Sequence, residues 1–200
     1  MKKAHVILLC LFAACSYGVV HDQITVRLAI EYFTIAHPPI FRATSPTLLG
    51  LCWGIAATSG IGVGLGTILA LVSQSDGYPP YPIAQIKKDL LRLVAAMAIA
   101  SSLAGVVGYQ LSKRDLISIA SHFAETIPLQ KHDRFVAVWF MHLASYIVGF
   151  GWGSFLCYRV WRDRGKPAVL GLFPSSPVAT IRAISLLILG AFVLWLRFRP

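Results

Sequence analysis

Long uncharged stretches alternate with short polar ones along this chain. The clearest runs over residues 46–73, where Leu48 to Val72 carries no charged side chain. Ser45 followed by Pro46 is typical of a helix start, a capping serine before a proline at the first helical position. About 20 consecutive apolar residues suffice to cross a bilayer as a helix. This segment is therefore predicted to be a transmembrane helix.

The same reasoning predicts about five membrane-crossing helices in a single membrane domain of residues 1–200. Val6 to Val20 is a shorter apolar run behind two lysines. It fits either the core of a signal peptide or a first membrane anchor, and we favour the anchor because later helices can hold it in place. Asp133 is the expected cap of the fourth span. The predicted spans are 6–20, 46–73, 93–111, 135–158 and 178–198.

Two segments of mixed polarity predict short amphipathic helices on the outer face of the membrane. Asp22 can cap one that ends near His37, where two prolines follow, and Arg27 and Glu31 are spaced on it as an i,i+4 ion pair. Residues 115–127 carry an apolar and a polar stripe at helical spacing. The expected fold class is an all-α integral membrane protein with about five transmembrane helices.

Composition and charge support this class. Charged residues make up 13% and hydrophobic residues 56% of the chain, whereas a soluble domain carries about 25% charged residues. The net charge of +10 would suggest nucleic acid in a soluble protein. Here the basic residues flank the apolar runs, as anionic headgroups favour, and no nucleic-acid motif is present. We expect a lipid bilayer as the surroundings, and no nucleic acid as a partner.

Basic residues also predict the orientation. Lys2, Lys3 and the basic cluster at 159–166 are expected on the cytoplasmic side, which leaves the N-terminus inside and residue 21 outside. Most histidines and acidic residues then fall on the outer side. His142 would lie about two turns into the fourth span, in the outer half of the membrane.

An ionisable side chain within a span is costly and usually faces a cavity or a partner. A neutral His142 that is hydrogen-bonded to a neighbouring helix is the plainer interpretation. The sharper one is that imidazoles and carboxylates gathered on one side bind a divalent metal or move protons. The first candidates for such a metal site are His21, Asp22, Glu31, His37 and His142.

Recognised catalytic and cofactor motifs are missing from the sequence. It contains no HExxH, His-x-His, CxxCH or GxSxG, and the glycine series 60–66 does not follow a strand, which excludes a dinucleotide fingerprint. Only His142 is plainly intramembrane, which disfavours haem. The four cysteines lie in apolar runs without a CxxC pair and are interpreted as small buried residues. Any metal site must therefore be assembled from separate segments.

Small residues spaced four apart, among them Gly50 with Gly54 and Gly62 with Gly66, predict close packing of helices in lipid.

A second pattern carries a resemblance to small bacterial inner-membrane proteins without an assigned activity. The resemblance implies a location in the bacterial inner membrane and no mechanism. Its residues are His21-Asp22-x-x-Thr25, Glu31-Tyr32-Phe33-Thr34-x-x-His37-Pro38-Pro39 and Leu49-Gly50-Leu51-x-Trp53-Gly54.

Three functions compete at this point. The first is an outward-facing His/carboxylate site for a metal or a proton, with unknown activity. The second is a structural or accessory subunit, whose glycine-rich helix faces serve a homo-oligomer or a larger membrane complex. A channel or transporter without metal ranks last, because five helices make a thin pathway and nothing resembles a selectivity filter.

Overall fold

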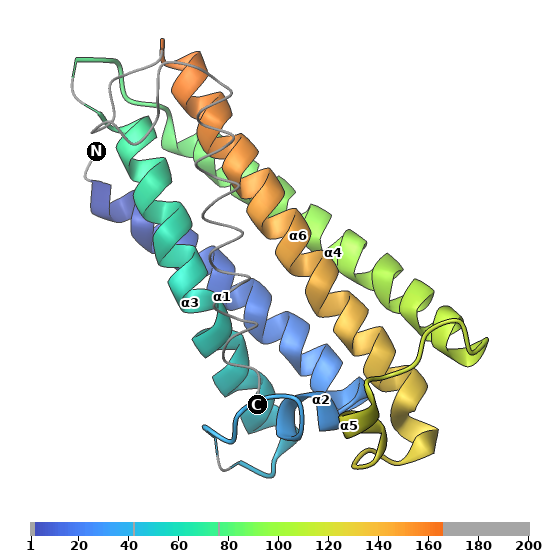
Figure 1. Cartoon of the computed structure of the whole chain (residues 1–200). Coiled ribbons are helices and arrows are strands. Elements are labelled where there is room, and N and C mark those ends of the chain that lie inside the picture. The colour runs from blue at the N-terminus through green and yellow to red at the C-terminus, as the bar shows by residue number, and fades with distance from the viewer. Residues whose placement is uncertain (1–2, 42, 76, 166–200) are drawn as a thin grey trace.

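The computed structural model describes residues 3–41, 43–75 and 77–165. All regular structure in these ranges is helical (Figure 1). The elements in chain order are α1 (Lys3–Leu28), α2 (Glu31–Thr34), α3 (Pro46–Ser73), α4 (Ile83–Lys113), α5 (Ser121–Ala124), the 3-10 turn η1 (Leu129–Lys131) and α6 (His132–Asp163).

Four helices among the described residues are long and apolar enough to cross a membrane, rather than the five that we predicted. They are α1, α3, α4 and the segment Leu129–Asp163 that contains α6. The predicted spans 46–73, 93–111 and 135–158 each lie within one of these helices. The fifth predicted span, 178–198, lies outside the described residues.

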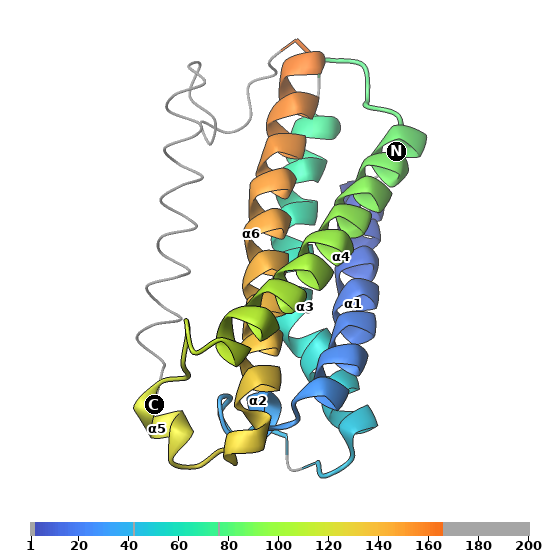
Figure 2. The same cartoon turned by 90° about the vertical axis from the view of Figure 1, so that its right-hand side faces the viewer.

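The four helices form two close pairs, α1 with α3 and α4 with α6 (Figures 1 and 2). The C-terminal ends of α1 and α4 lie beside the N-terminal ends of α3 and α6, at the bottom of Figure 1. We call this the site end of the bundle. The loops at 29–45 and 114–131 both belong to it, so the two polar segments lie at the same end of the bundle.

Glycines allow α1 and α3 to approach closely, as the spacing predicted. A Cβ atom added at Gly54 would lie 2.6 Å from Val19 Cα, and one at Gly62 would lie 2.8 Å from Leu11 Cα. Gly60 and Gly64 have nothing within 4 Å of such an atom. Within the series 60–66, Gly62 and Gly66 therefore pack against α1, whereas Gly60 and Gly64 do not.

The predicted separate helix that begins at Asp22 is wrong. The segment after residue 20 continues α1 without a break to Leu28, so Asp22 is an internal helical residue and caps nothing. The Arg27–Glu31 pair does not form either: Arg27 donates to Gln23 Oε1 at 2.6 Å, and Glu31 pairs with Lys131 at 3.6 Å. Gly50 makes this possible, since its missing side chain leaves room for the last turns of α1 against the start of α3.

The segment 115–127 is likewise less helical than predicted, with only α5 formed. Asp115 adopts a positive φ of 56°, which ends the helical path directly after α4. The apolar positions still pack: Ile119 and Ile127 are buried in a cluster that includes Phe135. A short helix with its flanking loop is therefore enough to bury Ile119 and Ile127, and a continuous helix over 115–127 is not required.

Asp133 is not the cap of α6, which begins one residue earlier without a side-chain cap. Its carboxylate instead accepts a hydrogen bond from Ser112 Oγ at 2.7 Å. This contact ties the last turn of α4 to the first turn of α6. At this point a tertiary contact replaces the local one that the sequence suggested.

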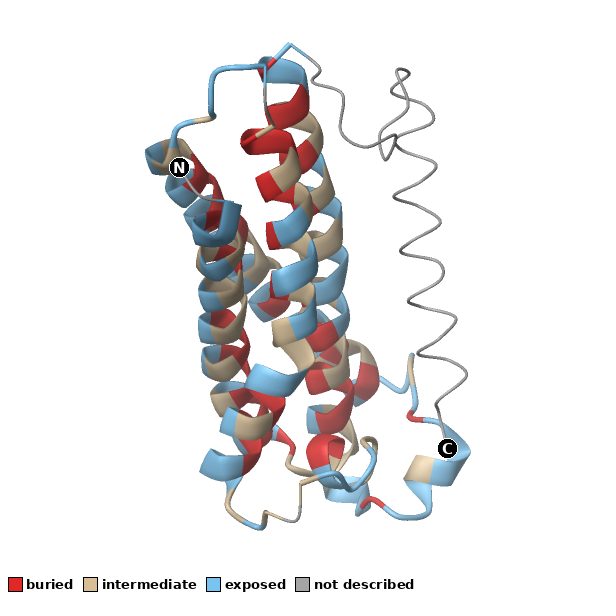
Figure 3. Cartoon of the chain, turned by 90° about the vertical axis from the view of Figure 1, so that its left-hand side faces the viewer, coloured by how far each residue is buried: buried red, intermediate tan, exposed pale blue. Residues whose placement is uncertain are grey.

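Buried residues face the middle of the bundle and exposed residues face outward (Figure 3). Many of the exposed side chains are large and apolar. Phe12 is 72% exposed and Leu91 is 70% exposed. Apolar side chains around the whole circumference are the pattern of helices surrounded by lipid. One buried cluster fills the end opposite the site and a second fills the site end.

Buried charges close the opposite end. Asp89 on α4 is 2% exposed and pairs with Arg159 and, at 3.3 Å, with Arg92. Arg164, directly after α6, donates to the carbonyl oxygens of Val72 at 2.6 Å and of residues 75, 78 and 79. A single guanidinium thereby satisfies carbonyls at the end of α3 and in the turn that leads to α4.

Candidate metal centre

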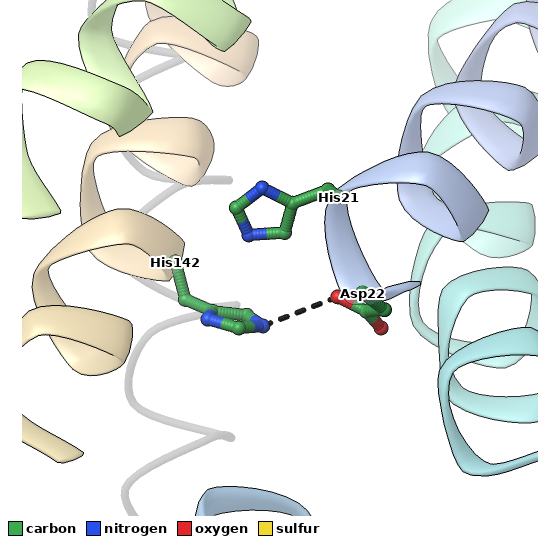
Figure 4. Close-up of side chains that lie close together, drawn as sticks. All are labelled: His21, Asp22 and His142. Atoms are coloured by element: carbon green, nitrogen blue, oxygen red, sulfur yellow. Dashed lines mark hydrogen bonds and ion pairs between the residues drawn. The ribbon is translucent and has the colours of Figure 1, made fainter. Parts of the chain in front are cut away.

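Three of the predicted site residues meet inside the bundle. His21 and Asp22 are neighbours on α1, and His142 faces them from α6 (Figure 4). Their exposed fractions are 8%, 5% and 6%. Each side chain offers one possible ligand atom, and these atoms all lie within 4.8 Å of one another. Among the described residues the three candidate ligands come from α1 and α6, so the site depends on how the two helix pairs come together.

The hydrogen bonds of His142 define what its second nitrogen can do. Nδ1 donates to the Val138 carbonyl oxygen at 2.9 Å, because a carbonyl can only accept. Nε2 then faces Asp22 Oδ1 at 3.3 Å. Either a proton lies between Nε2 and the Asp22 carboxylate, bonded to one or the other, or the two groups share a metal cation. Charge-assisted N–H···O bonds are usually about 2.7–2.9 Å, so the observed gap is wide for a tight ion pair.

The ring of His21 stands edge-on to that of His142, with the ring centroids 4.6 Å apart at 74° (Figure 4). Its Nδ1 lies 3.4 Å from Ser101 Oγ on α4. Its Nε2 is fully buried and has no hydrogen-bond partner among the described residues. Buried nitrogens of this kind are rare in folded proteins and call for an explanation.

One cation between the three side chains would satisfy all of these atoms at once. Two imidazole nitrogens and one carboxylate oxygen suit a divalent transition ion such as zinc or iron(II) better than calcium or magnesium, which prefer oxygen ligands. Ligands about 2.1 Å from an ion are at most about 4.2 Å apart. The three side chains would thus have to rotate slightly inward in order to hold it.

Neighbouring groups hold the two imidazoles in place. Tyr17 stacks on His21 at 5.5 Å, and Tyr17 Oη lies 2.7 Å from Ser145 Oγ. Ser145 Oγ already donates to the Met141 carbonyl, so the Tyr17 hydroxyl is the donor in this bond. Groups that orient ligating histidines in this way tune and rigidify metal sites.

Aromatic rings cover the site on the side of its loops. The Tyr32 ring lies 4.4 Å from the His142 ring, and the Phe33 ring lies 5.8 Å from it. Both belong to α2, which folds back over the bundle after α1 ends. This cover keeps water away from the imidazoles and strengthens electrostatic interactions beneath it.

The other two predicted ligands lie outside this group. Glu31 faces Lys131, as described above. His37 Nδ1 donates to the Tyr32 carbonyl oxygen at 2.7 Å, and its ring contacts Trp53 at a centroid distance of 4.6 Å. Burial lowers the pKa of His37 below its ordinary value of 6.5. Any metal role for these two residues stays a prediction.

Ser145 follows His142 by three residues on α6 and shares its helix face, whereas the sequence did not lead us to nominate Tyr17 or Ser101. Both are isolated polar residues within predicted spans, which is the signal that could have identified them. Their role depends on which helices become neighbours. Comparison of the chain with protein-family models, curated proteins and solved structures returns no match, so the site geometry alone carries the functional argument.

Proposed function

We propose that this chain is a membrane protein that binds one divalent transition-metal ion at His21, Asp22 and His142. The observation that carries the proposal is the buried convergence of two imidazoles and a carboxylate, with His142 Nε2 turned toward Asp22. An ion there would take the place of the proton that the two groups otherwise share.

The number of ligands suggests what the ion would do. Structural zinc sites are usually closed by four protein ligands, whereas catalytic sites keep three and leave a position for water or substrate. Only three candidate ligands converge here among the described residues. The proposal is therefore a reactive or exchangeable metal centre. The resemblance and the basic clusters favour the bacterial inner membrane with the N-terminus inside, which makes the site end periplasmic.

Elemental analysis tests the proposal directly. The full chain is purified in lipid nanodiscs without chelator and without a histidine tag, and its metal content is measured by mass spectrometry. We expect close to one zinc or iron ion per chain. His142→Ala should lose the metal, and Asp22→Asn should weaken its retention during dialysis.

The matched control is His122→Ala, which removes an exposed histidine from the loop at the same end of the bundle. It should retain the wild-type metal content. Wild-type protein that takes up no divalent metal, even when zinc and iron(II) are supplied anaerobically, would overturn the proposal. His142 and Asp22 would then be a structural ion pair, and co-purification with a larger complex would favour the accessory-subunit alternative.

A further inference from the structure

An apolar pocket adjoins the proposed metal centre. It has a volume of about 80 Å³ and lies in the seam between the two helix pairs, with walls from α1, α3, α4 and α6. A water molecule requires about 10–15 Å³ by a comparable measure. His21, Asp22 and His142 all line this pocket, so the three candidate ligands border the same cavity.

Polarity is distributed unevenly along the pocket. Most of its polar wall residues lie near the candidate metal centre, where Tyr17 and Ser145 join His21, Asp22 and His142. Farther from the site end the walls are carbon and sulfur, with Cys10, Leu65 and Met97. From Asp22 back to Cys10, α1 covers about 18 Å, at 1.5 Å per residue. The pocket is thus polar at one end and apolar along the rest.

A cavity region with purely apolar walls accepts apolar molecules, and this applies to the part of the pocket away from the site end. Several walls in the seam, including Leu65, Val94 and Phe150, are only half buried, and Tyr146 at the polar end is 36% exposed. The neighbouring outer faces are apolar and suited to lipid. Access is therefore expected sideways from the bilayer.

We infer that the pocket binds a single-chain amphiphile with an anionic oxygen head group, of the fatty-acid type. The alkyl chain occupies the apolar part, and the head group reaches the metal centre. A divalent ion with Asp22 as its one anionic ligand leaves a net positive charge, which complements a carboxylate. The head-group part rests on the proposed function, whereas the chain part does not.

Photo-crosslinking tests the inference. Full-length protein in phosphatidylcholine nanodiscs is irradiated with palmitic acid that carries a diazirine near the end of its chain, and labelled peptides are mapped by mass spectrometry. We expect label at Cys10–Ala14 and Leu93–Met97, and excess palmitic acid should reduce it severalfold. Label on lipid-facing residues such as Leu91 and Leu103 is non-specific and should not be competed.

Two variants fill the pocket from different helices, Met97→Trp on α4 and Ala57→Leu on α3. Each should lower the competed labelling by at least roughly tenfold, the loss expected when about two methylene groups no longer find an apolar site. The control Ile99→Trp adds the same bulk to a 62% exposed position of α4 and should leave the labelling unchanged. If one of the two variants does not fold, the other still tests whether the alkyl chain occupies the pocket.

The outcomes separate this inference from the proposed function. Competed pocket labelling in a protein that binds no metal would overturn the metal proposal and the head-group role, and would leave the chain site standing. A metal-bound protein whose label falls only on lipid-facing residues would overturn the amphiphile inference alone. If both hold, removal of the metal with a chelator should weaken competition by palmitic acid more than competition by hexadecane.

Discussion

His142 Nε2 lies 3.3 Å from Asp22 Oδ1, although 120 residues separate them in the chain. The backbone carbonyl of Val138 fixes the other nitrogen of this histidine as a donor. The contact therefore requires a shared positive charge, whether a proton or a metal ion.

The carboxylate of Asp22 should contribute to metal affinity, and not only to packing. Asp22→Asn keeps the shape of the side chain but removes the charge, and we expect the affinity for zinc to fall by at least about tenfold, the lower end of what outer-shell changes already cost. Competition with a fluorescent chelator measures it. Glu125→Gln, an exposed change at the same end of the bundle, should have no effect. Equal affinities in both variants would exclude Asp22 as a ligand.

Close packing of α1 on α3 depends on particular glycines. Gly54→Ala places a methyl group against the backbone of Val19, and we expect it to destabilise the protein by about 1–3 kcal/mol through overpacking. Gly60→Ala meets open space and should stabilise α3 by up to about 1 kcal/mol through helix propensity. Thermal unfolding in detergent compares the two variants. A similar unfolding temperature for both would contradict the assigned helix face.

Arg164 should anchor the turn between α3 and α4. Arg164→Ala leaves the carbonyl of Val72 and those of the turn without their donor, and the expected loss of stability is about 1.5–3 kcal/mol. Arg162→Ala removes an exposed guanidinium that donates to its chain neighbour Asp163 and should change stability little. Proteolysis of the turn at 74–82 provides a second readout, since it should accelerate in the first variant only.

His37 should make stability depend on pH. Burial lowers its pKa in the folded protein below the ordinary value of 6.5, so the unfolded chain binds a proton more readily. Its contribution is then fully present above about pH 6.5 and is lost as the pH falls below that value. His37→Phe keeps a ring beside Trp53 and cannot titrate. Between pH 8 and pH 5 the unfolding temperature of wild type should fall more than that of this variant, and parallel curves would disprove the effect.

The two loops of the site end should lie on one side of the membrane. Single cysteines are placed at exposed positions in a cysteine-free background: Ile40 and Leu129 at the site end, and Tyr78 at the opposite end. In intact cells a membrane-impermeant maleimide should label positions 40 and 129 alike, and position 78 only after the cells are opened. Labelling of 40 and 129 from opposite sides would contradict the bundle itself. Labelling of position 78 alone would reverse the proposed orientation.

The fold class was determined by the sequence, because an apolar helix satisfies its own backbone within one segment and its hydrophobic pattern is a local property. The start of α3 followed from a local signal as well, the serine–proline pair, although the Ser45 side chain makes no capping hydrogen bond. The segment after residue 20 did not. Asp22 resembles a helix cap locally, but in the structure its segment continues α1 and packs closely against α3 at Gly50.

The candidate site, too, was predicted from the sequence only in part. Histidines and carboxylates stood out as ionisable residues near or within apolar runs, and this was enough to nominate His21, Asp22 and His142. Their selection over Glu31 and His37 depended on side-chain directions across two helix pairs, and the contributions of Tyr17 and Ser101 depended on the same packing. Which helices become neighbours is set by side-chain packing between segments far apart in the chain, and no local pattern encodes it.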